Sequence, residues 1–165
     1  MGVNFNADEI LAMAEQIERN GANFYRKAAA SAKAKDAAAK LKELAAMEEN
    51  HEKIFAAMRS RLSEKQKGGT PFDPYGEAQA YLKAFADGHV FDIKADPAAT
   101  LTGKESLARI LRKAIGLEKD SVVFYVGLKN LVPADLGREK VEEIIAEEMK
   151  HIAILSMELL AAGTR

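Results

Sequence analysis

Apolar residues follow one another at alternating steps of three and four along four long stretches of this chain, which is the spacing of helices that bury one face. The first two stretches run from about residue 7 to residue 62, and the last two from about 104 to 162. Between the pairs, from 63 to 103, the rhythm stops and glycine and proline recur. The pattern predicts an all-α fold: an antiparallel four-helix bundle made of two helical hairpins that one long crossover joins.

Capping signals mark the ends of the predicted helices. Asn6 and Glu9 form a capping box at the start of the first helix, and Phe5 would add a hydrophobic staple. Asp36 is placed to cap the second helix. The segment Thr102–Glu105 would start the third helix as another capping box.

The crossover has weaker signals of its own. Within it, Glu77–Ala86 is expected to form a short helix and Val90–Ile93 an extended piece, either of which would cover a bundle end or a partner subunit. His89 has no helical partner and is expected at the surface or in an interface. With 165 residues, the whole chain is interpreted as one domain.

Acidic and imidazole side chains interrupt the apolar seams at matching places. Glu48 and His51 stand three residues apart, so one helix face carries both, and the same Glu-x-x-His pair returns a hundred residues later. A further glutamate stands thirty residues before each pair. The full set is Glu18, Glu48, His51, Glu118, Glu148 and His151.

These matches belong to an internal repeat, in which one helical hairpin is written twice. Two residues of an antiparallel hairpin lie at the same height when they are equally far from its turn. The midpoint of Glu18 and Glu48 is residue 33, and that of Glu118 and Glu148 is residue 133; both fall in predicted turns. All six side chains can therefore share one layer of the bundle.

Metal ions give this layer a physical explanation. Unpaired ionised carboxylates in a core cost several kcal/mol each, or they become protonated. Two divalent metals would balance four carboxylates, with the two imidazoles as neutral ligands. Oxygen-rich ligation with one imidazole per metal suits iron or manganese, and zinc would compete. We expect Glu48 and Glu148 to bridge the metals, and Glu18 and Glu118 to bind at the ends.

Other side chains near the layer have less specific signals. Tyr25 and Tyr125 lie two turns beyond the terminal glutamates on the same faces. Each hydroxyl can orient a ligand carboxylate, or each residue is a plain core aromatic whose buried hydroxyl is hydrogen-bonded elsewhere. Glu52 and Glu147 neighbour the layer as rim charges or as a further ligand. Glu49, Glu158 and Asp120 are interpreted as rim or outer-face charges.

Composition excludes several classes of function. Basic and acidic residues number 24 and 25 without blocks of one sign, which argues against a nucleic-acid partner. The chain has no cysteine, so disulfides, thiolate catalysis and cysteine-bound metal are excluded. Neither a secretion signal nor an apolar run of about 18 residues is present, and a cytoplasmic protein without membrane contact is expected.

The residues Glu18, Phe24-Tyr25, Glu48-x-x-His51 and their copies at 118, 124–125, 148 and 151 resemble the ferritin-like superfamily, and within it the rubrerythrin group. The resemblance covers both hairpins and is weak in the crossover. It implies a ferritin-like fold and a bridged site of two iron ions, held by the six residues, that reacts with hydrogen peroxide or dioxygen. Rubrerythrins usually carry a cysteine-bound iron site as electron donor and many have an extra carboxylate where this chain has Ser121.

The leading hypothesis is therefore a di-iron oxidoreductase of peroxide or dioxygen, assembled as a homodimer and supplied with electrons by a separate donor protein. One alternative is a ferroxidase that stores or delivers iron with the same site. Storage needs a hollow shell, and little sequence follows the fourth helix to build the fifth helix that ferritin-like cages usually have. A second alternative is a structural dinuclear metal site that stabilises the bundle.

Overall fold

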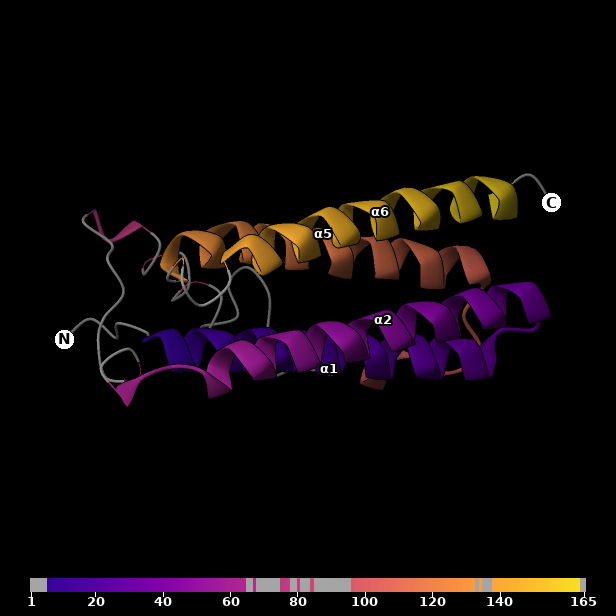
Figure 1. Ribbon diagram of the computed structural model, residues 1–165. Coiled ribbons are helices and arrows are strands. Elements are labelled where there is room, and N and C mark those ends of the chain that lie inside the picture. Colours follow the sequence, from indigo (N-terminus) through magenta and orange to yellow (C-terminus); the bar gives the residue numbers. More distant parts are fainter. Residues whose placement is uncertain are drawn as a thin grey trace.

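The protein is an all-α four-helix bundle, as predicted (Figure 1). The computed structural model describes residues 6–64, 96–132 and 138–163, together with positions 67, 75–77, 80, 84 and 134. No strand occurs in this part of the chain. Its elements are α1 (Ala7–Ser31), α2 (Lys35–Ser60), the short 3-10 helix η1 (Pro97–Thr100), α5 (Leu107–Leu131) and α6 (Arg138–Gly163).

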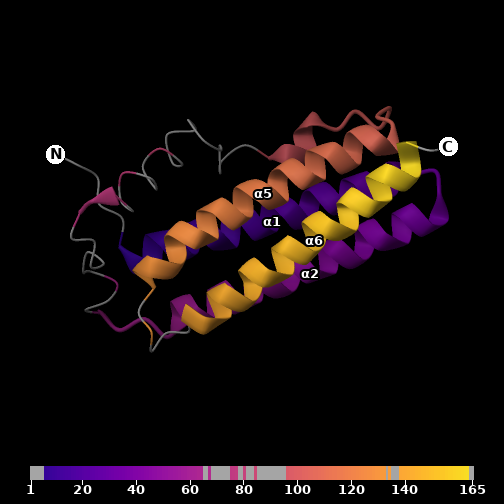
Figure 2. The same ribbon diagram turned by 90° about the horizontal axis from the view of Figure 1, so that it is seen from above.

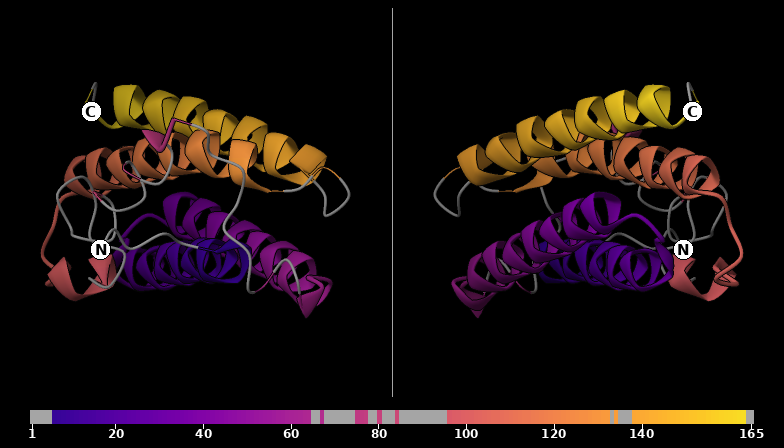
Figure 3. Two further views of the ribbon diagram at one scale, coloured as in Figure 1. Left: turned by 90° about the vertical axis from the view of Figure 1, so that its left-hand side faces the viewer. Right: turned by 90° about the vertical axis from the view of Figure 1, so that its right-hand side faces the viewer.

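The two hairpins stack on each other as two layers, with α1 and α2 in one layer and α5 and α6 in the other (Figures 1 and 2). Across the layers, α1 contacts α5 and α2 contacts α6. Helix α5 begins at the same end of the bundle as the turn between α1 and α2, and α2 ends at the opposite end (Figure 1). Two further views show the same two layers, with the orange and yellow helices above the indigo and magenta ones (Figure 3). Each hairpin therefore packs one of its faces against the other hairpin.

The start of α1 is the capping box that the sequence predicts. The side chain of Asn6 accepts a hydrogen bond from the Glu9 amide, and the Glu9 carboxylate accepts one from the Asn6 amide, each at 2.9 Å. Phe5, the predicted staple, lies outside the described residues. Two of the four amide donors that a helix start leaves unpaired are thereby satisfied near this end.

Two other predicted helix starts are wrong. Helix α2 begins after Ala34 without a side-chain cap, and Asp36 lies inside its first turn, where an acidic residue still suits the helix dipole. Helix α5 begins after Ser106, whose hydroxyl accepts from the Arg109 amide. The predicted box at Thr102–Glu105 is instead a separate turn, because Gly103 has a φ of 81°, which a helix cannot contain.

The end of the crossover packs against α1. The Asp96 side chain caps η1 by accepting from the Ala98 amide at 2.8 Å, and the Lys27 ammonium of α1 donates to the Ala98 carbonyl at 2.8 Å. Most of the helix predicted at Glu77–Ala86 lies outside the described residues, as do His89 and the piece predicted at Val90–Ile93.

The apolar core consists of two clusters. One contains Ile10, Phe55, Leu128 and Val141, and the other contains Phe24, Leu44, Leu111 and Leu155. Both clusters draw on all four long helices, and each tyrosine of the repeat belongs to a different cluster. Between them in sequence, on every helix, stand the buried acidic and imidazole residues. None of the helices in the described part of the chain is long and apolar enough to cross a bilayer.

Candidate metal centre

All six acidic and imidazole residues singled out from the sequence lie in the core. None of them is more than 4% exposed. Helices α1 and α5 contribute one glutamate each, and α2 and α6 contribute one Glu-x-x-His pair each. The turn between α1 and α2 spans residues 32–34, which includes the midpoint that the sequence argument requires. The local helical spacing and the short turn therefore place these side chains at one height.

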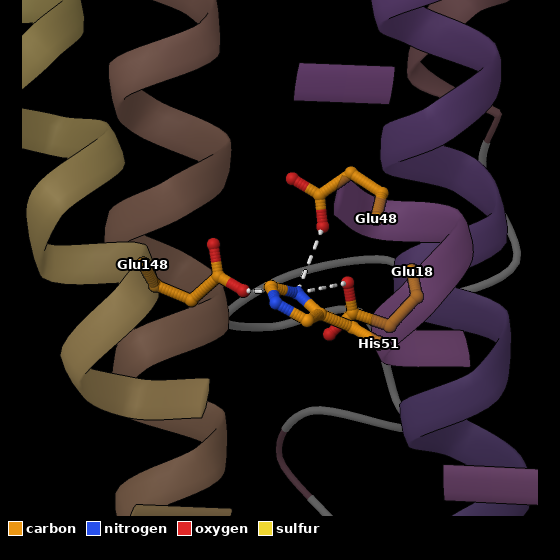
Figure 4. A group of neighbouring side chains, drawn as sticks. All are labelled: Glu18, Glu48, His51 and Glu148. Carbon is orange, nitrogen blue, oxygen red and sulfur yellow. Dashed lines mark ion pairs between the residues drawn. The ribbon is translucent and has the colours of Figure 1, made fainter. Parts of the chain in front are cut away.

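The six side chains form two overlapping groups of four. One group is Glu18, Glu48, His51 and Glu148, and the other is Glu48, Glu118, Glu148 and His151. In each group one ligand atom per residue lies within 4.8 Å of the other three. Figure 4 shows the first group, in which Glu148 approaches from the opposite hairpin. Glu48 and Glu148 belong to both groups, so they stand where bridging ligands of a two-metal site would stand.

Glu148 lies between the two imidazoles. Its Oε1 is 2.9 Å from Nδ1 of His51, and its Oε2 is 2.9 Å from Nδ1 of His151. Glu48 is farther from both rings, at 3.6 Å and 3.7 Å. The two rings are nearly parallel, with an interplanar angle of 18° and centroids 6.0 Å apart. Both Nδ1 atoms thus face one central carboxylate.

Several polar atoms of this layer are buried without a hydrogen-bond partner among the described residues. They are Nδ1 of His51, both carboxylate oxygens of Glu148, and Nδ1 and Nε2 of His151. An unsatisfied buried polar group costs roughly 1–3 kcal/mol, so a folded protein rarely keeps several together. All but Nε2 of His151 point to the centre of the cluster, where a metal ion would satisfy them. The donor set, four carboxylates and two imidazoles without sulfur, fits iron or manganese.

The electrostatics of the metal-free cluster favour protonated imidazoles around Glu148. Burial alone lowers the pKa of His151, but the carboxylates of Glu118 and Glu148 outweigh it and raise that pKa to about 9. Carboxylates also raise the pKa of His51 against burial. Burial raises the pKa of Glu118 to about 8, whereas the two imidazoles hold the pKa of Glu148 well below its usual range despite its burial. Metal ions would take the place of these protons.

The two buried tyrosines cross from one hairpin to the other. The Tyr25 hydroxyl donates to Oε1 of Glu118, and the Tyr125 hydroxyl donates to Oε1 of Glu18. Burial contributes most to raising the pKa of both phenols, and the nearby carboxylates raise it further. Each tyrosine therefore stays protonated and holds a carboxylate in place.

Glu147 has a contact that the sequence did not predict. Its Oε2 lies 2.7 Å from Nε2 of His51, on the outer side of the ring, while its own side chain is 41% exposed. It thus belongs to neither group of four and is not simply a rim charge. The internal repeat gives no signal for it, because the matching position holds Met47.

The remaining rim glutamates have partners away from the cluster. Glu52 accepts from the Arg19 guanidinium at 2.6 Å and 3.0 Å, so it is not a further ligand in this arrangement. Glu49 pairs with Arg26, and Glu158 lies 3.2 Å from the Lys40 ammonium.

A small cavity of about 20 Å³ adjoins the cluster between α1 and α5. It is the size of about one water molecule, and among its lining residues are Glu48, Glu118, Tyr25, Asn20 and Ser121. A larger hollow of about 550 Å³ lies at the bundle end, beside the α1–α2 turn and residues 103–107, and none of the six cluster residues lines it. Of these two hollows, the small cavity is the one that lies beside the cluster.

Comparison with known proteins agrees with the fold. Residues 9–88 match the Rubrerythrin family model. A solved structure from Thermotoga maritima, described as a ferritin-like diiron-carboxylate protein, superposes with a TM-score of 0.69 over 94% of this chain and 95% of that one, at 23% identity. Residues 9–88 are thus similar to the rubrerythrin family, and the chain has the ferritin-like fold. No curated protein sequence matches it significantly.

Ser121 of α5 is a polar residue that lines the small cavity. Its hydroxyl donates to the Leu117 carbonyl of its own helix at 3.1 Å. Among the described residues, the two groups of four draw on the same six residues, and Ser121 is not one of them.

Proposed function

We propose that this protein is a di-iron oxidoreductase that reduces hydrogen peroxide or dioxygen with electrons from a separate donor protein. The observation that carries the proposal is the pair of overlapping four-residue groups around the unsatisfied atoms of Glu148 and the two Nδ1 atoms. Glu18, Glu48, His51, Glu118, Glu148 and His151 would hold the metals.

The reaction needs little from the protein beyond a prepared site. Reduction of hydrogen peroxide to two water molecules takes two electrons and two protons, and the two irons, when bound, supply the electrons. Glu48 and Glu148 keep the two metal positions adjacent. The two apolar clusters exclude bulk water from both ends of the layer.

The small cavity and the tyrosines suit the handling of a small oxidant. A guest in the cavity would lie beside Glu48 and Glu118, and its size limits that guest to a few atoms. The Tyr25 hydroxyl lines the same cavity and is hydrogen-bonded to Glu118. It can hold a proton at the carboxylate edge while keeping that carboxylate oriented.

Metal analysis and optical spectroscopy test the proposal together. Protein from its native source should contain two irons per chain, and the anaerobically reduced protein should gain a near-ultraviolet absorbance when one equivalent of peroxide is added. Glu48→Gln should abolish this response, whereas Glu49→Gln, the matched change at the half-buried neighbour that pairs with Arg26, should keep it. A protein that holds one metal per chain, or whose reduced spectrum does not respond to peroxide, would contradict the proposal.

Particle size separates the enzyme from iron handling at the same site. A monomer or a homodimer fits the oxidoreductase, while a shell of roughly 24 subunits that retains ferric iron would favour storage. A structural site would instead show loss of the fold on chelation and no spectral response to peroxide.

A further inference from the structure

The two halves of the centre match in their ligands but differ on the outer side of the imidazoles. Nε2 of His51 lies 2.7 Å from the Glu147 carboxylate. Nε2 of His151 is equally buried, yet no described residue offers it a hydrogen-bond partner. The repeat preserves the six cluster residues and the crossed tyrosine bonds, but it does not preserve this contact.

A single substitution between the halves accounts for the difference. A shift of one hundred residues brings Glu147 onto Met47. Neither residue is buried, so the two positions match in the repeat but differ in chemistry. A thioether is a weak, uncharged acceptor, so it cannot do for His151 what a carboxylate does for His51.

We propose that the two metal positions are unequal, and that Glu147 makes the position beside Glu18 and His51 the one that binds its metal first. This inference rests on the proposed dinuclear function. A carboxylate that accepts the outer N–H of an imidazole fixes the ring and makes the inner nitrogen a stronger ligand. Loss of such a partner typically lowers metal affinity 10–100-fold. We therefore expect the metal affinities of the two positions to differ by that factor.

Glu147 acts as a positioning residue, because it touches His51 and none of the central carboxylates in the structure. If it only tied α6 to α2, its replacement would change the stability of the bundle but not the order in which the two positions fill. The order of filling is therefore the measurement that separates the two roles.

Calorimetric titration of the metal-free protein with Mn(II) under anaerobic conditions tests the affinity gap. The wild type should bind two equivalents in two steps that differ 10–100-fold in dissociation constant. Glu147→Met should weaken the first step until the two steps merge. Glu147→Gln keeps an acceptor without the charge, so its first-step affinity should lie between those of the wild type and Glu147→Met. Met47→Glu should strengthen the second step.

Crystals grown with one equivalent of Mn(II) test the position directly. The anomalous signal should lie beside His51 in the wild type and beside His151 in the exchange variant Met47→Glu/Glu147→Met. Equal occupancy in the wild type, or an unchanged order in the exchange variant, would overturn the inference while leaving the dinuclear site intact. No manganese bound by any form would contradict the proposed function, and the inference with it.

Discussion

Tyr25 of α1 donates its hydroxyl to Glu118 of α5, so a residue of the first hairpin satisfies a carboxylate of the second. The repeat-related bond from Tyr125 to Glu18 runs in the opposite direction. The two bonds fasten the hairpins to each other at the level of the cluster. Glu18 faces the centre with its other oxygen, since Oε2 lies 3.5 Å from Nδ1 of His51, whereas in Glu118 the bonded Oε1 itself lies 3.6 Å from Nδ1 of His151.

Removal of either hydroxyl should destabilise the protein. Tyr25→Phe and Tyr125→Phe each leave a buried carboxylate oxygen without its donor, and we expect each to lower the free energy of unfolding by about 1–3 kcal/mol. Urea unfolding of the metal-free protein measures this. Tyr75→Phe is the control, because Tyr75 is 85% exposed and its change should stay within about 0.5 kcal/mol. Equal stabilities for all three variants would show that the crossed bonds contribute nothing.

The stability of the metal-free protein should fall as the pH rises from about 6.5 to 9. The pKa of His151 is raised from 6.5 to about 9, so its stabilising proton is fully present below 6.5 and is lost as the pH passes 9. The raised pKa of Glu118, from 4.5 to about 8, acts in the same direction. Thermal unfolding at pH 6, 7.5 and 9 checks this, and a midpoint that climbs over that range would refute it.

Bound metal should reverse that trend. Metal ions and protons compete for the same nitrogen and oxygen atoms, so affinity rises with pH. With each metal at 100 times its dissociation constant, we expect about 2.7 kcal/mol of added stability per site. Differential scanning calorimetry with and without Mn(II) at pH 7.5 measures the gain, and a chelator should remove it. A midpoint that does not move on metal addition would argue against a site in the folded state.

Two helical glycines offer a matched test of the space beside Glu48. A Cβ at Gly21 would lie 3.4 Å from Cγ and 3.5 Å from Cδ of Glu48, whereas one at Gly116 would meet nothing within 4 Å. Gly116→Ala should therefore stabilise the protein by about 0.5–1 kcal/mol through helix propensity. Gly21→Ala should gain less, because the new methyl group presses on the Glu48 side chain. Equal gains in urea unfolding would show that Glu48 has room to move there.

Much of the fold follows from local spacing. The seams through Leu11, Phe55, Leu128 and Ile144 are buried as their steps of three and four require. The errors lie at helix ends: Asp36 and Thr102–Glu105 carry good capping residues, but the helices start elsewhere. Tertiary contacts and the backbone angle of Gly103 decide those boundaries, and neither can be seen in a capping motif.

Part of the candidate centre could likewise be predicted from the sequence, and part could not. The sequence by itself determined which six polar residues interrupt the seams and that they lie at one height, because helical periodicity and distance from a turn are local properties of the chain. Only the tertiary structure decided that Glu148 lies between both imidazoles, that each tyrosine bonds to the opposite hairpin, and that Glu147 supports His51 alone. These contacts depend on how the two hairpins are rotated and stacked, which the spacing within one helix does not encode.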